Sequence, residues 1–410
     1  METLYPRCAG LDVHKDTVVA CVRIQGTGSR ATTTETRSFK THTAALLELL
    51  SWLEQNECSH VVMEATGVYW KPVWHILAGP FELLLANAKH VRNVPGRKTD
   101  VKDAEWLANL LAHGLINASF VPPAPIQELR DLTRTRKQFV RQRVQHVNRI
   151  QKVLEDANIK LCSFISDVTG VSGRAILEAL IAGETDPNKL AELGNSRLKT
   201  PREVLALALQ GQLTSHHRFL LQTHLDQVDM TDQSISRLDA RIEEAARPFD
   251  EMVERLTEMP GMSKNGAHIV LAEIGHDMSR FPTAAHLVSF AGLCPRLDES
   301  AGKRRSTRIR KGSNWLKSAL VSCAWAAARA KNTYARAQYH RIKTRRGAKK
   351  AVVAVAASML TAIYYLLQRH QPYQDLGPQH FDRRYRNCIV SRLRRRIEEL
   401  GYVVQIAPAA

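Results

Sequence analysis

Short apolar runs separated by polar bends dominate the first third of the chain. Residues 8–14 and 17–24 are rich in valine and flank a polar bend, which predicts a β-hairpin or meander. Further strands are predicted over 38–41, 60–65 and 81–86, and helices over 43–55, over 68–77 and from Thr99 to about His113. Strands in hairpin order, followed by strands alternating with helices, predict a mixed α/β sheet.

The pattern changes after residues 121–125, VPPAP, because consecutive prolines interrupt regular structure. Residues 126–159 and 216–259 then place apolar side chains every three or four positions, which predicts two long helices. The glycine-containing segment between them predicts short helices and turns. Two long helices with a helical tip predict a central antiparallel coiled coil.

The last third is mainly helical. Residues 259–268, MPGMSKNGAH, resemble a helix-hairpin-helix, which presents backbone N–H groups to a phosphate, although a helix-packing turn gives the same letters. Residues 351–367 form an apolar run, but a membrane span usually needs about 20 residues, mostly larger than alanine. Its alanines, together with Ser358 and Thr361, favour a helix packed inside the protein, so no membrane is expected as a partner.

Composition narrows the choice of partner and compartment. The chain has 58 Lys and Arg against 40 Asp and Glu, a net charge of +18, which favours nucleic acid or an anionic membrane surface. The seven cysteines are scattered, which argues against a disulfide framework or a zinc site and fits a reducing cytoplasm. The N-terminus, METLYPRCAG, shows no secretory signal pattern, so a cytoplasmic protein is expected.

Four carboxylates stand out in this basic protein. Asp12 and Glu64 each end a short apolar run, and Asp100 and Asp103 are one helical turn apart. Carboxylates from separate elements that meet at one point can hold divalent cations during phosphoryl transfer, and Mg²⁺ prefers such oxygen ligands. For Asp100 alone, capping of a helix start is an equal alternative.

A second candidate centre is Ser300. A serine is a poor nucleophile unless a base, cation or metal activates it, and a serine beside glycine is usually a loop residue. Nearby cations would hold a scissile phosphate. They are Lys303, Arg304, Arg305, Arg308, Arg310 and Lys311. The basic face of the first long helix, with Arg134 and Arg141, follows a phosphate backbone or is simply solvated.

Six segments carry a family resemblance. GLDVHKD, MEATGVYW and RKTDVKDAEWLA resemble the N-terminal domain of the insertion-sequence-110 family of bacterial transposases, relatives of the Piv-type DNA invertases. PGMSKNGAHIVLAEIG, the segment ending in FAGLCP and ESAGKRRSTRIRKGSNWLKSALV resemble the C-terminal transposase domain of that family. The match spans about residues 5–335.

The resemblance implies an RNase-H-like (RuvC-like) N-terminal fold with a DEDD metal tetrad, here Asp12, Glu64, Asp100 and Asp103, that binds Mg²⁺ or, as a substitute, Mn²⁺. It implies that Ser300 is a nucleophile that forms a phosphoserine link to a DNA end, with the tetrad supplied by a neighbouring subunit. It also implies a tetramer, and a structured guide RNA from the element's non-coding end that pairs with donor and target DNA.

Together these observations predict four domains: a RuvC-like DEDD domain (1–122), a coiled-coil linker (123–258), a transposase domain with the serine (259–340) and a basic helical extension (341–410). Many relatives have Ser-Gly or Gly-Gly after the serine and this chain has Ala-Gly, so Ser306 is the alternative nucleophile. The expected function is an RNA-guided transposase in the bacterial cytoplasm, associated with the nucleoid. A RuvC-type endonuclease using metal-activated water and a non-catalytic nucleic-acid scaffold are the alternatives.

Overall fold

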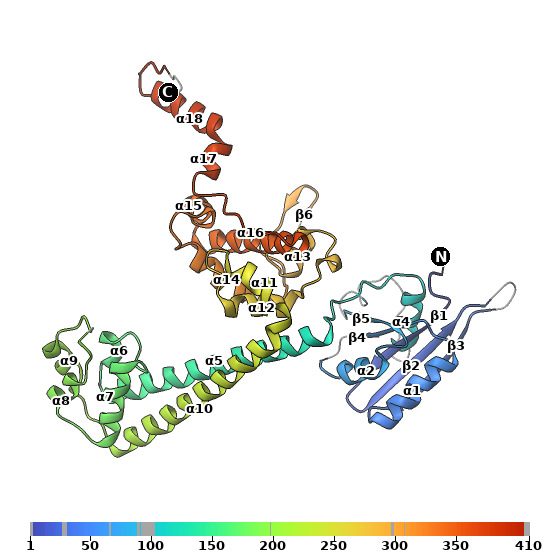
Figure 1. Ribbon diagram of the computed structural model, residues 1–410, viewed down its shortest axis with the longest axis horizontal. Coiled ribbons are helices and arrows are strands. Elements are labelled where there is room, and N and C mark those ends of the chain that lie inside the picture. Colours follow the sequence, from blue (N-terminus) through green and yellow to red (C-terminus); the bar gives the residue numbers. More distant parts are fainter. Residues whose placement is uncertain are drawn as a thin grey trace. The chain divides into compact units, whose positions relative to one another are not determined.

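The computed structural model of the chain (Figure 1) describes residues 3–26, 31–64, 67–87, 91, 103–196, 198–296, 299–306 and 308–405. Its contacts divide the chain into two compact units, Met1–Val121 and Pro122–Ala410. We call the first the sheet unit, since it is built on five strands, and the second the helical unit.

The sheet unit has the strand order β3-β2-β1-β4-β5. Strands β1, β2 and β3 form an antiparallel meander, whereas β4 runs parallel to β1 and β5 runs parallel to β4. This is the RNase-H-like order, and it confirms the predicted mixed sheet. The elements are β1 (Arg7–Val13), β2 (Thr17–Ile24), β3 (Thr33–Lys40), α1 (Thr43–Gln55), β4 (His60–Glu64), α2 (Trp70–Leu77), β5 (Glu82–Ala86) and α4 (Asp103–Ala112).

Two apolar clusters cover the two faces of the sheet. On one face, Ala9 and Leu11 of β1 and Val61 of β4 pack with the leucines of α1 and with α2. On the other face, Cys8 of β1 and Val62 of β4 pack with α4. Alternate residues of each strand therefore serve different layers, as a pleated strand requires.

Two sequence-predicted boundaries in this unit need comment. The third strand is longer than predicted, Thr33–Lys40 rather than 38–41, because its TTETRSFK sequence lies largely exposed at the sheet edge and lacks an apolar signal. The predicted cap Thr99 lies outside the described residues, and α4 begins at Asp103 in the part of the chain that is described.

The helical unit begins with two long helices, α5 (Ala124–Asp156) and α10 (Ser215–Ala246), which pack along each other (Figure 1). Arg136 of α5 pairs with Asp239 of α10, and Arg143, which is later in α5, pairs with Asp232, which is earlier in α10. The two helices are therefore antiparallel. Short helices close their far end: α6 (Leu161–Phe164), α7 (Val171–Ala182), α8 (Pro187–Glu192) and α9 (Arg202–Ala208).

The prediction of one continuous helix over 216–259 is wrong. Helix α10 ends at Ala246, a 3₁₀ turn spans Arg247–Phe249, and α11 (Asp250–Thr257) follows. Pro248 explains the break, because proline lacks the N–H that would continue the helical hydrogen bonds.

The rest of the helical unit surrounds α16. The remaining elements are α12 (Lys264–Ile274), a 3₁₀ turn (Met278–Arg280), α13 (Ala284–Phe290), β6 (Glu299–Ser300), β7 (Lys303–Arg304), α14 (Asn314–Ala327), α15 (Tyr334–Arg346), α16 (Ala348–Arg369), α17 (His380–Arg384) and α18 (Arg386–Glu398). Although α16 is long and apolar enough to cross a membrane, over half of its most apolar stretch is buried inside the protein. Its Val355, Leu360 and Ile363 are fully buried in the largest core cluster, as the alanine-rich sequence predicted.

Candidate active site

Strand register brings Asp12 and Glu64 to the same level of the sheet. Leu11 of β1 pairs with Met63 of the parallel strand β4, and Asp12 and Glu64 are the next residue of each strand. Because neighbouring parallel strands end at the same edge, the two acids lie side by side at the carboxyl ends of β1 and β4.

Both acids also project from the same face. Cys8 precedes Asp12 by four residues and Val62 precedes Glu64 by two, so each pair shares one face of its strand. Cys8 and Val62 pack in the cluster formed with α4. Asp12 and Glu64 therefore continue, at the open end, the face that α4 covers, and both are half-buried.

Helix α4 lies unusually close to β1. A Cβ atom at Gly10 would lie 2.9 Å from Leu107 Cβ and closer still to the backbone of Ala104 and Ala108, so only glycine permits this approach. The thiol of Cys8 donates to Ala108 O at 3.5 Å. The helix thus runs antiparallel to β1, with its first residue, Asp103, at the end of the strand where Asp12 lies. We call Asp12, Glu64 and Asp103 the acid site.

These residues suit a hard divalent cation. Three half-buried carboxylates lie at one edge of the sheet unit, and carboxylate oxygens are the ligands that Mg²⁺ and Mn²⁺ take. Within the described ranges no three His, Cys, Asp or Glu side chains lie close enough to form a complete metal-binding group, and Asp100 lies outside those ranges.

His14 joins this edge. Its Nε2 lies 3.1 Å from Oδ2 of Asp12, and its ring is more than half exposed while Asp12 is 20% exposed. The histidine thereby fixes one carboxylate oxygen of Asp12 and leaves the other oxygen available.

Ser300 lies on a β-hairpin, which was not predicted from the sequence. It ends β6 and pairs with Lys303 of β7, and the intervening Ala301 and Gly302 both have positive φ, at 50° and 72°. Two central residues of this kind make a type I′ turn. The segments on either side of this hairpin also pair with each other: Arg296 N donates to Arg308 O, and Arg310 N donates to Cys294 O. We call the described residues 294–296, 299–306 and 308–310 the hairpin arm.

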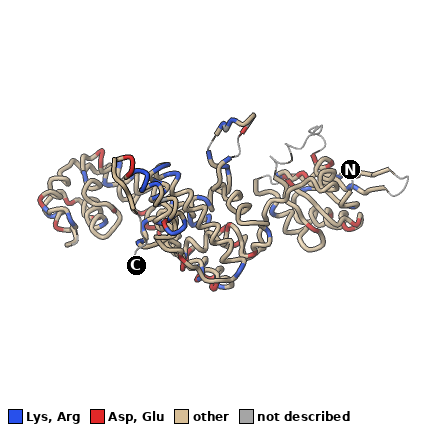
Figure 2. Tube along the Cα trace, turned by 90° about the horizontal axis from the view of Figure 1, so that it is seen from above, with Lys and Arg blue, Asp and Glu red and all other residues tan. Residues whose placement is uncertain are grey.

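The hairpin arm carries exposed cations. Figure 2 shows blue Lys and Arg positions along the loop that projects from the helical unit. Arg310 donates to the Ser289 hydroxyl at 2.8 Å, and Arg304 belongs to β7. The alternative nucleophile, Ser306, is half-buried, and its hydroxyl accepts from Arg308 N at 3.2 Å. Besides Arg310, the exposed cations of the arm are Arg296, Lys303, Arg305 and Arg308, and the exposed Lys311 directly follows the arm.

Arg134 and Arg141, predicted together as nucleic-acid contacts, have different environments. Arg134 donates from Nε and Nη2 to both oxygens of Glu273, at 2.7 and 2.9 Å, and the Glu273 side chain is 2% exposed. Arg141 is exposed and lies over the Trp315 ring at 5.2 Å. The charge of Arg134 therefore belongs to a buried ion pair, whereas that of Arg141 faces solvent.

Most cations on the basic face of α5 contact other helices, so this face is neither simply solvated nor a continuous surface for a phosphate backbone. Besides Arg134, Arg136 and Arg143 pair with acids of α10, and Lys137 donates to Ser318. Burial lowers the pKa of Lys137. Arg134, Arg136, Lys137 and Arg143 therefore hold helices together, whereas Arg141 stays exposed.

The turn before α12 uses its glycine for packing. A Cβ at Gly261 would lie 2.8 Å from Ala327 Cα and closer to the Cys323 carbonyl, both on α14. Ser263 caps α12 by accepting from Gly266 N at 3.1 Å. The helix-packing alternative accounts for these residues.

Glu273 and Trp315 were not singled out from the sequence. Glu273 accepts from Arg134 and, at 3.2 Å, from Ser313, which itself caps α14 at the base of the hairpin arm. The single acid in the helix KNGAHIVLAEI, placed within its apolar run IVLAEI, was the available signal, because a carboxylate on a buried face needs a partner.

An RNase-H-like sheet with acids at the carboxyl ends of β1 and β4 defines a class of metal-dependent enzymes acting on nucleic-acid phosphates. A DEDD transposase sequence model matches residues 9–159, and one of the IS116/IS110/IS902 transposase family matches residues 253–340. Together they cover more than half of the chain, which therefore belongs to this IS110-type family of transposases, enzymes that transfer DNA phosphoryl groups. Membership implies a divalent metal and DNA binding.

Individual relatives are distant. The pilin gene-inverting protein of Moraxella bovis is 22% identical over 383 residues, covering 89% of this chain and 96% of that protein. The transposase for insertion sequence element IS1111A of Coxiella burnetii is 22% identical over 321 residues, covering 77% and 79%. A 43.6 kDa protein of IS110 from Streptomyces coelicolor is 33% identical over 127 residues, 30% of each chain.

Proposed function

We propose that this transposase is an RNA-guided recombinase that moves its own insertion sequence through a serine–DNA intermediate. The observation that carries the proposal is the register that sets Asp12 beside Glu64, with Asp103 at the adjacent start of α4. The serine and the guide RNA rest on the resemblance of the ESAGK and GLDVHKD segments to the family. Four domains, divided at residues 122, 258 and 340, remain part of the proposal.

Asp12, Glu64, Asp103 and Asp100 would hold Mg²⁺, for which Mn²⁺ is a substitute. When bound, the ion neutralises charge on the phosphate and polarises its oxygens. The chain's own contribution is orientation: packed strands fix Asp12 and Glu64, and His14 holds one oxygen of Asp12. Such preorganisation supplies much of the rate in phosphoryl transfer.

Ser300 would attack the scissile phosphorus. Its oxygen forms a new ester bond to phosphorus, the bond to one deoxyribose oxygen breaks, and that oxygen leaves as a hydroxyl with the serine proton. The reverse reaction, with a hydroxyl end from another strand, restores the serine and joins new partners. Because each step exchanges one phosphodiester for another, the sequence needs no cofactor energy.

The cations of the hairpin arm, together with Arg141, would hold nucleic-acid phosphates beside Ser300. The exposed cations of the arm lie close together on a projecting ribbon, which suits contact with a nucleic-acid backbone. A homotetramer, in which one subunit's acids meet another subunit's serine, and a structured guide RNA complete the proposal. Its place would be the bacterial cytoplasm, at the nucleoid.

A covalent trapping experiment tests the proposal. Purified protein, element-derived RNA, Mg²⁺ and end-labelled donor and target DNA are combined, and products are separated under denaturing conditions. We expect a protein–DNA adduct that Ser300→Ala removes and Ser306→Ala retains. Adduct formation that depends on Ser306 would move the nucleophile, and cleavage without any adduct in the wild type would support a RuvC-type endonuclease instead.

A further inference from the structure

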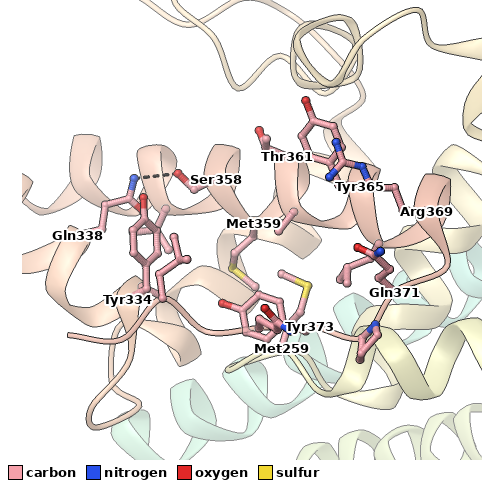
Figure 3. A pocket seen from close by; sticks show the side chains of 17 residues that line it. Met259, Tyr334, Gln338, Ser358, Met359, Thr361, Tyr365, Arg369, Gln371 and Tyr373 are labelled. Atoms are coloured by element: carbon pink, nitrogen blue, oxygen red, sulfur yellow. Dashed lines mark hydrogen bonds between the residues drawn. The ribbon is translucent and has the colours of Figure 1, made fainter. Parts of the chain in front are cut away.

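The helical unit contains an open apolar groove next to its C-terminal segment. Figure 3 shows it along α16, with Met359 and Tyr365 on the helix side and Tyr373 and Gln371 on the facing segment. Its volume is about 780 Å³, and Leu376, which also lines it, is 58% exposed. A groove of this size and character takes apolar side chains of a partner.

The groove has charges of both signs nearby: Arg369 lines it and lies over the Tyr365 ring at 4.6 Å, and Glu258 lies at the wall formed by Tyr373. Met259, a lining residue, directly follows Glu258, the residue after α11, and the exposed Glu254 of α11 and Glu258 form no ion pair among the described residues. Glu258 accepts from Tyr373 N at 3.0 Å, which places its carboxylate at the groove wall. An occupant with both an apolar stripe and positive charge would match this wall.

Helix α18 has those properties and lacks cover. Val390, Leu393, Ile397 and Leu400 are spaced by three, four and three residues, the spacing of a coiled-coil seam. Leu393, Ile397 and Leu400 are 52%, 41% and 71% exposed. Arg392 and Arg396, which flank one side of the stripe, form no ion pair in the described part of the chain.

Helix α17 packs on Tyr334, a residue that lines the groove, but no described residue of α18 in the same copy is among the lining residues. Phe381 of α17 stacks on Tyr334 with ring centroids 5.0 Å apart, and Arg341 lies 4.6 Å from the Tyr385 ring centroid. These contacts fix the start of α18 on α15, and α18 leaves the core from there (Figure 1).

We propose that α18 of one copy docks in the groove of a second copy of this chain, and that the two copies exchange their tails. Leu393, Ile397 and Leu400 would enter beside Met359 and Leu376, and Arg392 and Arg396 would approach Glu254 and Glu258. Reciprocal exchange buries two stripes and closes the pair, as an isologous dimer requires. This inference rests on the proposed homo-oligomer, but neither the acid site nor Ser300 takes part in it.

Nucleic acid fits the groove less well than this helix does. Its tyrosines and glutamines suit a base and Arg369 also lines it, but the Glu258 carboxylate at the wall repels a phosphate backbone. A nucleic-acid ligand would also leave the stripe on α18 exposed.

Photo-crosslinking of nuclease-treated full-length protein tests the exchange. Leu376 is replaced by p-benzoylphenylalanine, ¹⁴N- and ¹⁵N-labelled copies are mixed and reconcentrated, and crosslinked peptides are identified by mass spectrometry after irradiation. We expect links from position 376 to residues 386–405 of the differently labelled copy. Leu393→Glu with Ile397→Glu should reduce them at least tenfold, whereas Ser391→Glu, which adds one negative charge on another face of α18, should leave them unchanged.

Three results would overturn the proposal: tail links only within one isotopic copy, no tail links at all, or equal loss in the Ser391→Glu control. Because the stripe is exposed in the single chain, circular dichroism of the double variant should match the wild type. Since no DNA, RNA or metal is present, the outcome is independent of whether the proposed recombination chemistry is correct.

Discussion

The acid site and the hairpin arm place their candidate reactive groups in opposite ways. Asp12 and Glu64 end strands that are buried on both faces, and Gly10 lets α4 press directly on β1. Ser300 instead ends a two-residue strand beside a turn with no side-chain neighbours around Gly302. Groups that must hold a metal in fixed geometry benefit from a rigid sheet, whereas a group that must reach a long flexible substrate is better carried on a projecting ribbon.

Removal of an acid-site carboxylate should have the largest effect. Asp12→Asn and Glu64→Gln keep the shape of the side chain but remove a charge needed for a divalent cation, so we expect transposition to fall by roughly 10³-fold or more. Excision and insertion assays in cells measure this, with purified protein checked for unchanged thermal unfolding. The exposed Asp16 is the matched control, and Asp16→Asn should retain activity. Loss of activity in Asp16→Asn alone would contradict the assignment.

A single added methyl group tests the rigidity of the acid site. Gly10→Ala places a Cβ against Ala104, Leu107 and Ala108, so it should destabilise the sheet unit by about 3 kcal/mol and displace α4. Gly302→Ala, at the open turn of the hairpin arm, meets no atom within 4 Å and is strained only by its φ of 72°, so it should cost no more than about 1 kcal/mol. Urea unfolding of both variants makes the comparison, and equal effects would show that the two sites do not differ in packing.

Arg134 and Arg141 separate structural from exposed cations within the helical unit. Arg134→Met leaves the buried Glu273 without its bidentate partner and should cost about 2–3 kcal/mol in unfolding free energy. Arg141→Met should change stability by less than about 0.5 kcal/mol. It should instead weaken nucleic-acid binding and reduce the slope of log K against log salt by about 1. The opposite assignment of these effects would refute the distinction.

The acid site could be found from sequence because its residues end apolar strands, a local signal. Its register could not, because pairing of Leu11 with Met63 is a long-range property. The same limit explains α5: Arg134 and Glu273 are 139 residues apart, so nothing near Arg134 reveals that its charge is already neutralised. The hairpin arm was missed because its strands are only two residues long, with too few positions for alternation to show.

Buried thiols of the sheet unit give the smallest predicted effect. Burial raises the pKa of Cys8 to about 11 and that of Cys58 to about 12, from an ordinary value of 9.0. As the pH rises, each thiol therefore ionises in the unfolded chain before it does so in the folded chain. The contribution of the buried thiols to folding stability is fully present below pH 9 and is lost as the pH rises toward 11. The loss approaches about 1.4 kcal/mol per pH unit for each thiol.

Urea unfolding at pH 8, 9 and 10 measures this loss. Cys58→Ala serves as the reference, because other groups also titrate in this range and only the difference between the two proteins reports the thiol. A gap between wild type and Cys58→Ala that does not narrow with rising pH would contradict the prediction. The exposed Cys388, by contrast, should react rapidly with iodoacetamide at pH 8 while Cys8 and Cys58 do not.

The location of bound metal tests the central claim most directly. Crystals of the transposase grown with Mn²⁺ should show an anomalous scattering peak within about 2.5 Å of carboxylate oxygens of both Asp12 and Glu64, with Asp103 or Asp100 nearby. The peak should vanish in Asp12→Asn. A Mn²⁺ peak elsewhere on the chain, or a site at this edge that survives loss of both Asp12 and Glu64, would contradict the account.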